Sequence, residues 1–452
     1  MAARANLATI SQQFKRGALR PIDLVDRCLA SIKQHEPAIH AWVKVDERGA
    51  RQAAQALGDE LERGQSRGPL HGIPIGIKDI FDVAGWPTKA GSSLRAQHVA
   101  AEDATVVARL RAGGAILLGK TVTTEYACFD PSVTHNPWNP AHTPGGSSAG
   151  SAASVALGMC LAAVGSQTGG SITRPASYCG VAGIKPTFGL LDLGGVVPVS
   201  FHLDHAGAMA RSVSDLAAML LVMSTPTAEE GVPHDAPHVN YLAAGEGARM
   251  PRLGVIEPFF LERCDDTVKA GFRQAIDNLR QGGVHIVAVA PPTSFADLLP
   301  LHRKIMAVEA AAYHRAAFEA NRPAYGKQIA GLIDEGLRMP AYEYAMAIRH
   351  LEWYREHAWD DLPEIDALVT PATTTPAPAR LDTTGDPQFN SPWSYAGLPT
   401  VSIPCGLSRE GLPIALQLIG PKLSELTLLS AAAWCERRLR FEAEPALTKG
   451  NT

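Results

Sequence analysis

Three residues that lie far apart in the chain have the types needed for acyl-transfer chemistry. Lys78 follows the run Gly72-Ile-Pro-Ile-Gly-Ile, while Ser147 and Ser171 each follow a pair of glycines. A serine hydroxyl attacks a carbonyl at neutral pH only when a neighbouring base takes its proton, and a lysine is such a base only when neutral. Burial among the isoleucines of this run would lower the pKa of Lys78 and supply that condition.

The glycines before Ser171 suggest a second catalytic feature. Glycines let the backbone turn tightly, so successive N–H groups can point at one developing oxyanion. We therefore expect Thr168, Gly169, Gly170 and Ser171 to form an oxyanion hole. Either Gly/Ser turn taken alone is ordinary, and only their combination with the lysine favours catalysis.

Two further motifs compete with this interpretation. Residues 114–121 match the phosphate-loop pattern G-x-x-x-x-G-K-[ST], but Ala-Ile-Leu-Leu between the glycines predicts a buried strand, whereas a phosphate loop has its strand before the first glycine. Residues 146–150 match G-x-S-x-G, which would make Ser148 the nucleophile of an α/β-hydrolase esterase acting with a histidine. That elbow needs a strand directly before it, and the prolines of 136–144 argue against one.

Hydrophobic periodicity predicts the elements that must position these residues. We expect helices at 22–34, 46–63, 105–112, 148–157, 266–280 and 425–438, with 295–360 mostly helical. We expect strands at 72–79, 115–118, 161–164, 253–256, 284–289, 367–370, 401–404 and 414–419. This alternation predicts an α/β fold with one large mixed sheet covered by helices on both faces.

Composition limits the other function classes. Of 452 residues, 46% are hydrophobic and 19% charged, and the net charge of -4 includes no basic stripe, so we expect no nucleic-acid partner. No signal peptide and no apolar run of about 18 residues are evident, so we expect no membrane association. Seven cysteines without C-x-x-C spacing favour a reducing compartment, the cytoplasm. Five histidines match no metal-ligand spacing and are expected to be structural or solvent-exposed: His71, His135, His142, His202 and His205.

The motifs together resemble the amidase signature family. The resemblance rests on 72–79, on Gly-Gly-Ser-Ser-Ala-Gly-Ser at 145–151, on Gly-Gly-Ser-Ile at 169–172, on 179–189, and on 396–404 with 411–420. It covers nearly the whole chain and implies one amidase signature domain over 1–452. We expect that domain to have N-terminal helices at about 1–65, a helical insertion at about 295–360 and a loose tail after 440.

By this resemblance, each residue of a Ser-Ser-Lys triad has a role. Ser171 would be the acylated nucleophile, Ser147, held by a cis peptide bond, the proton shuttle, and Lys78 the final base. The implied enzyme is an amidohydrolase of linear amides that needs no metal and no cofactor.

Two positions depart from the family pattern. Family members commonly carry Asp four residues before the nucleophile and Arg two residues after it, where this chain has Gln167 and Thr173. Arg174 follows one place later, and we expect it to take the supporting role. The family's amidotransferase A-type subunits also carry an arginine-rich helix, and 329–336 contains no arginine, which disfavours the alternative of a glutamine-hydrolysing subunit in a complex.

Four aromatic residues are the expected walls of the substrate pocket: Phe129, Trp138, Trp393 and Tyr395. Aromatic walls favour a small apolar or aryl amide as substrate, with activity extending to carbamates (urethanes) and esters. We expect an enzyme that acts alone as a monomer or homodimer.

Overall fold

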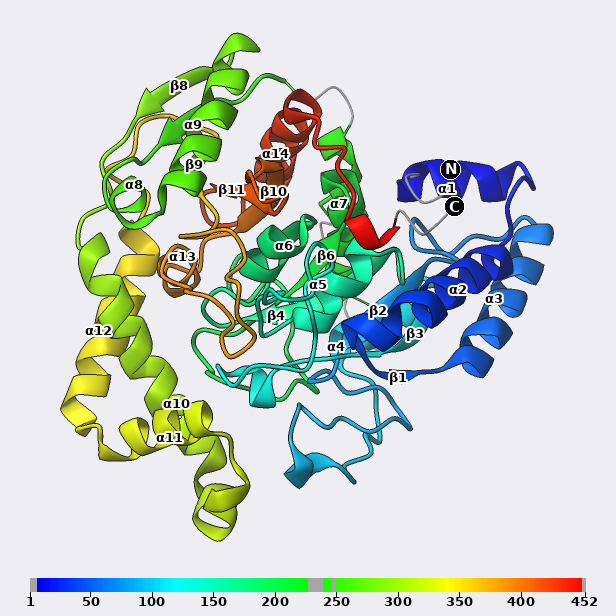
Figure 1. Ribbon diagram of the computed structural model, residues 1–452, viewed down its shortest axis with the longest axis horizontal. Coiled ribbons are helices and arrows are strands. Elements are labelled where there is room, and N and C mark those ends of the chain that lie inside the picture. Colours follow the sequence, from blue (N-terminus) through cyan, green and yellow to red (C-terminus); the bar gives the residue numbers. More distant parts are fainter. Residues whose placement is uncertain (1–5, 227–238, 246–248, 449–452) are drawn as a thin grey trace.

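One mixed sheet of eleven strands organises the molecule (Figure 1), in a computed structural model that describes residues 6–226, 239–245 and 249–448. The strand order is β1-β3-β2-β4-β6-β5-β10-β11-β9-β7-β8. β2 pairs in parallel with β3 and β4, and β7 with β8 and β9, whereas the other pairs are antiparallel. The strands are β1 Trp42–Val45, β2 Pro74–Lys78, β3 Ile116–Thr121, β4 Ala162–Gln167, β5 Ala182–Lys185, β6 His205–Ala210, β7 Arg252–Val255, β8 His285–Ala288, β9 Ala367–Pro371, β10 Thr400–Leu407 and β11 Pro413–Ile419.

Helices cover both faces of this sheet, which confirms the predicted α/β class. α5 and α6 contact each other and the central strands, while α14 packs against α7 and α9. Within the described residues the helices are α1 Leu7–Lys15, α2 Pro21–Ile39, α3 Glu47–Glu62, α4 Thr105–Ala112, α5 Ala149–Ala156, α6 Thr173–Cys179, α7 Val213–Ser224, α8 Phe260–Arg263, α9 Asp266–Gln281, α10 Leu298–Asn321, α11 Lys327–Arg338, α12 Ala341–His357, α13 Ser391–Tyr395 and α14 Glu425–Leu439.

The phosphate-loop pattern at 114–121 is a buried strand, as its apolar residues predict. β3 occupies most of it and is buried along its whole length. Lys120, the lysine of the pattern, lies 2.8 Å from Asp79, and both side chains are buried. This ion pair joins the end of β3 to the residue directly after β2.

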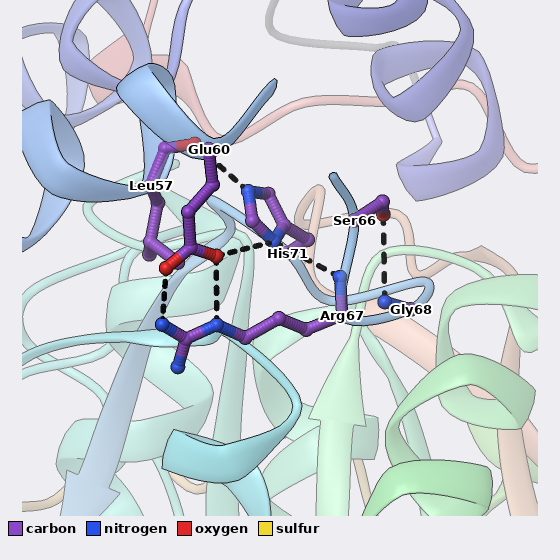
Figure 2. A network of polar contacts seen from close by, with 6 residues as sticks. All are labelled: Leu57, Glu60, Ser66, Arg67, Gly68 and His71. Carbon is purple, nitrogen blue, oxygen red and sulfur yellow. Dashed lines mark hydrogen bonds and ion pairs between the residues drawn. The ribbon is translucent and has the colours of Figure 1, made fainter. Parts of the chain in front are cut away.

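A polar network fixes the chain just before β2 (Figure 2). His71 Nδ1 accepts the N–H of Arg67 at 3.2 Å, so Nε2 carries the proton and donates to the carbonyl of Leu57 at 2.9 Å. Glu60 pairs with the Arg67 guanidinium. The 3.9 Å approach of Nδ1 to Glu60 is not an ion pair, because a ring with this pattern is neutral. The network ties α3 to the segment that leads into β2.

Segments of low hydrophobic contrast produced the errors in element prediction. β1, β5 and β6 were not predicted, and β5 and β6 consist largely of Ala and Gly, whose small side chains give no strand periodicity. α1, α6 and α7 were also missed. The tail after 440 was expected to be loose, but Phe441 lies against Trp138, with ring centroids 5.9 Å apart. No helix in the described part of the chain is long and apolar enough to cross a membrane.

Candidate active site

Lys78 and Ser147 form the centre of the site. Lys78 ends β2, and its ammonium group lies 2.7 Å from Ser147 Oγ and 2.8 Å from Ser166 Oγ. Ser166 belongs to β4, which pairs with β2, so the sheet itself fixes one of the two contacts. Lys78 is fully buried, and this burial lowers its pKa to about 7.

One buried carboxyl group acts against that shift. The charge of Asp204 raises the pKa of Lys78, although burial has the larger effect. Burial raises the pKa of Asp204 itself to about 6. Its carboxylate accepts from Thr168 Oγ1 and from the backbone N–H groups of Val199 at 2.7 Å and Ser200 at 3.0 Å. Asp204 therefore contacts the turn around Thr168 and also raises the pKa of Lys78.

The two serine-bearing segments lie side by side. The Gly146–Ser147 peptide bond is cis. The N–H of Ser148 donates to the carbonyl of Ser171 at 3.3 Å, so the loop that carries Ser147 contacts the turn that carries Ser171. Lys78 thus contacts Ser147, and the segment that carries Ser147 contacts the one that carries Ser171.

Ser148 has a different environment. Its hydroxyl donates to the carbonyl of Ser166 at 3.2 Å and accepts the N–H of Ser166 at 3.3 Å. The residue is fully buried at the start of α5, and a loop precedes it where an elbow would need a strand. Ser148 therefore lacks the strand-to-helix elbow that the α/β-hydrolase alternative requires.

The turn Thr168 to Ser171 has every carbonyl occupied. His302 Nε2 donates to Thr168 O at 2.9 Å and Ser394 Oγ to Gly169 O at 2.7 Å. Backbone N–H groups donate to the other two carbonyls, from Arg174 to Gly170 at 3.0 Å and from Ser148 to Ser171. Among the described residues, no acceptor takes the N–H groups of Gly169, Gly170 and Ser171. Such a turn presents three free donors, as an oxyanion hole requires.

A neutral pair replaces the family's charged pair in the same turn. Gln167 Oε1 accepts from the N–H groups of Ile172 at 2.9 Å and Thr173 at 3.0 Å, and from Thr173 Oγ1 at 3.1 Å. Gln167 Nε2 donates to Ser394 Oγ at 3.1 Å. The amide and the hydroxyl thus close the turn without a buried charge.

Arg174 contacts the loop that carries Ser147. Its Nη2 donates to the carbonyl of Gly146 at 2.8 Å and to Thr384 Oγ1 at 3.2 Å. The side chain is 2% exposed, and Nε and Nη1 have no partner among the described residues. Burial lowers the pKa of this guanidinium. Arg174 is therefore a buried cation that donates to the carbonyl of the cis peptide bond itself.

A cavity of about 310 Å³ opens onto the turn Thr168 to Ser171, which we call the oxyanion turn after the role expected from its sequence. Its apolar walls include Phe129, Val199, Leu299 and Met306. Of the four expected wall residues, only Phe129 lines it.

The other three aromatic side chains lie elsewhere, which corrects the pocket prediction. Trp138 donates to the carbonyl of Cys179 at 2.8 Å and lines a separate hollow beside Phe441. Trp393 stacks on Phe260 in the core. Tyr395 donates to the carbonyl of Ala347 at 3.2 Å. Large aromatic residues pack in the core as readily as in a pocket, and sequence alone cannot separate the two cases.

Sequence analysis missed His302, the one histidine that lines this cavity. It lies on α10, far along the chain from the serine motifs and without a motif of its own. The histidines expected to be structural have protein partners, such as His142 with Ala377 O at 2.7 Å and His202 with Glu309. In the described residues, no three His, Cys, Asp or Glu side chains are grouped to hold a metal ion.

Comparisons with known proteins point to one family over most of the chain. A family model described as Amidase matches residues 23–429. An amidase from Pseudomonas putida is 36% identical, over 96% of this chain and 96% of that protein. The A subunit of glutamyl-tRNA(Gln) amidotransferase from Chloroflexus aggregans is also 36% identical, over 91% of this chain and 92% of that protein. The structure of native peptide amidase from Stenotrophomonas maltophilia superposes with a TM-score of 0.85 at 30% identity, over 98% of both chains.

Proposed function

Because the chain belongs to the amidase family and is an amide-hydrolysing enzyme, we propose that it acts alone on amides of apolar or aryl acids and amines, with Ser171 as nucleophile. One observation carries the proposal: the buried Lys78 ammonium group lies 2.7 Å from Ser147 Oγ. A lysine with a pKa near neutrality that contacts a hydroxyl is equipped to relay protons.

The proposed reaction has two steps. Ser171 Oγ attacks the carbonyl carbon, and its proton passes through Ser147 to neutral Lys78. The carbonyl oxygen becomes an oxyanion, which the N–H groups of Gly169, Gly170 and Ser171 stabilise. The C–N bond then breaks, and the leaving nitrogen takes the proton back through Ser147, which leaves an acyl-enzyme. Water then attacks this ester and gives a proton through the same relay to Lys78. The C–O bond to Ser171 breaks, Ser171 Oγ takes that proton back, and the acid leaves.

The apolar walls support the substrate class. Phe129, Leu299 and Met306 offer hydrophobic surface beside the nucleophile. Carbamates and esters present a carbonyl to the same groups, so we include them in the proposed range.

Hydrolysis of acyl and carbamoyl 4-nitroanilides by the purified chain tests the proposal. We expect 4-nitroaniline release from the intact chain and its loss in Ser171→Ala, with the exposed Ser93→Ala as control. A fluorophosphonate label mapped to its peptide separates Ser171 from Ser148. Turnover that survives in Ser171→Ala contradicts the mechanism.

A second candidate function is a glutamine-hydrolysing subunit that works only inside an assembly. The similarity to the Chloroflexus amidotransferase protein favours it, whereas the lack of arginine in 329–336 disfavours it. Activity of the isolated chain towards simple amides decides between the two, because an assembly-dependent subunit shows none without its partners.

A further inference from the structure

His302 is a buried polar residue in the part of the cavity wall that α10 provides. It is 4% exposed, and Leu299, Arg303 and Met306 of the same helix also line the cavity. Residues three and four apart share one face of a helix, so Leu299 and Met306 flank the imidazole ring on this face of α10. The ring touches the oxyanion turn: a Cβ atom added to Gly169 would lie 3.7 Å from His302 Cε1.

The contact with Thr168 fixes the tautomer of this ring. Nε2 lies 2.9 Å from Thr168 O, and a carbonyl oxygen only accepts hydrogen bonds, so Nε2 carries the proton. Burial, with a smaller effect from Arg303, lowers the pKa of His302 to about 4, so the ring is neutral at pH 7. Nδ1 therefore bears a lone pair. Among the described residues, nothing donates to it.

A bound ligand that shuts this acceptor off from water must supply a donor, since an unpaired polar group without water is costly. We propose that His302 Nδ1 accepts a hydrogen bond from an N–H group on the acyl part of the substrate. The inference rests on the proposed amidase function and narrows its substrates to amides whose acyl group carries an N–H near the scissile carbonyl, such as N-acylamino acid amides.

The position of His302 assigns the donor to the acyl part. The leaving nitrogen must take its proton from Ser147, which lies against Lys78 at the end of β2. His302 instead holds Thr168, the other end of the oxyanion turn from Ser171. We therefore place the leaving group at the Ser171 end of the turn and the N–H donor to His302 at the Thr168 end.

Two amides that differ only in the donor test this inference: N-acetyl-leucinamide and its N-methyl derivative, N-acetyl-N-methyl-leucinamide. Ammonia release gives kcat/KM for each. One neutral hydrogen bond predicts a preference of about 5- to 10-fold for the N–H substrate in the intact chain. In His302→Gln the ratio should fall to about one, because glutamine Nε2 still reaches Thr168 O while no acceptor remains at the Nδ1 position.

Two other variants separate recognition from support of the turn. His302→Asn keeps an acceptor near the Nδ1 position but loses the Thr168 contact, so we expect lower kcat with the preference retained. His357→Gln changes an exposed histidine on α12 and should leave the ratio as it is. A preference that persists in His302→Gln, or equal kcat/KM for both amides in the intact chain, overturns the inference.

Binding distinguishes failure of this inference from failure of the proposed function. Calorimetry of both amides with Ser171→Ala measures recognition without turnover. If Ser171→Ala still hydrolyses amides, the nucleophile is wrong, and the binding preference in its His302→Gln double variant still decides the role of His302. Equal affinities, or no binding of either amide, overturn the inference.

Discussion

At the scale of single residues, we expect Lys78 to set the pH dependence of the reaction. The residue serves as a base only when neutral, and its pKa is lowered to about 7. We therefore expect kcat/KM to rise about tenfold per pH unit below 7 and to level off above it. Initial rates on a stable amide from pH 5 to 9 measure this. A flat profile would contradict it.

Lys185 provides a comparison for the assignment of Lys78 as the base. Burial lowers its pKa to about 7 as well, but its ammonium group donates to the carbonyls of Leu398 at 2.5 Å and Pro186 at 3.3 Å, and among the described residues it makes no hydrogen bond to a serine. Lys78→Met should reduce kcat by about 10²- to 10⁴-fold, the usual loss for a general base. If kcat survives in a folded Lys78→Met protein, Lys78 is not the base.

Arg174 offers a separate prediction. Its Nη2 holds the carbonyl of Gly146, next to Ser147, and a small misplacement of a catalytic group is costly. We expect Arg174→Met to lower kcat by about 10- to 100-fold, while Tm changes little, since the substitution also removes a buried charge with two unpaired nitrogens. Arg174→Lys keeps one donor and should recover part of the rate. Unchanged kcat in Arg174→Met would show that the contact is not needed.

At the scale of elements, the oxyanion turn depends on close packing against α13. A Cβ atom on Gly170 would lie 2.6 Å from Asn390 Oδ1. Gly170→Ala must therefore move the turn, and we expect kcat to fall by about 10²- to 10³-fold, the loss of one oxyanion donor. Steady-state kinetics measures kcat of Gly170→Ala and compares it with kcat of the control variant Gly331→Ala.

Gly331 is a matched control because it lies in α11, where an added Cβ atom would meet no neighbour and φ is not positive. There the same substitution should leave kcat unchanged and stabilise the protein by about 0.5 to 1 kcal/mol. Similar loss of activity in both variants would mean that alanine acts through general destabilisation.

The Lys120–Asp79 ion pair predicts a stability effect. Both side chains are buried where β2 and β3 end, so removing one partner leaves an uncompensated charge. Lys120→Met should cost about 3 to 5 kcal/mol and lower Tm. Asp79→Asn combined with Lys120→Met should recover part of that lost stability. Thermal melting of the single and double variants measures both effects. An unchanged Tm in Lys120→Met would mean that Asp79 finds another partner.

At the scale of the whole molecule, local sequence predicted the residues that lie on compact motifs. Lys78, Ser147 and Ser171 each stand in a short run whose glycines and apolar residues constrain the backbone, so their roles could be proposed before the fold was known. His302 could not be found in this way, because its neighbours on α10 form an ordinary amphipathic pattern. It meets the oxyanion turn only through tertiary packing.

The carbonyls of the turn Thr168 to Ser171 also depend on residues made much later in synthesis. Their donors are Ser148 just before α5, Arg174 on α6, His302 on α10 and Ser394 on α13. A growing polypeptide has Ser171 long before it has Ser394, so we expect the Gly169 carbonyl to gain this donor only after residue 394 has been made.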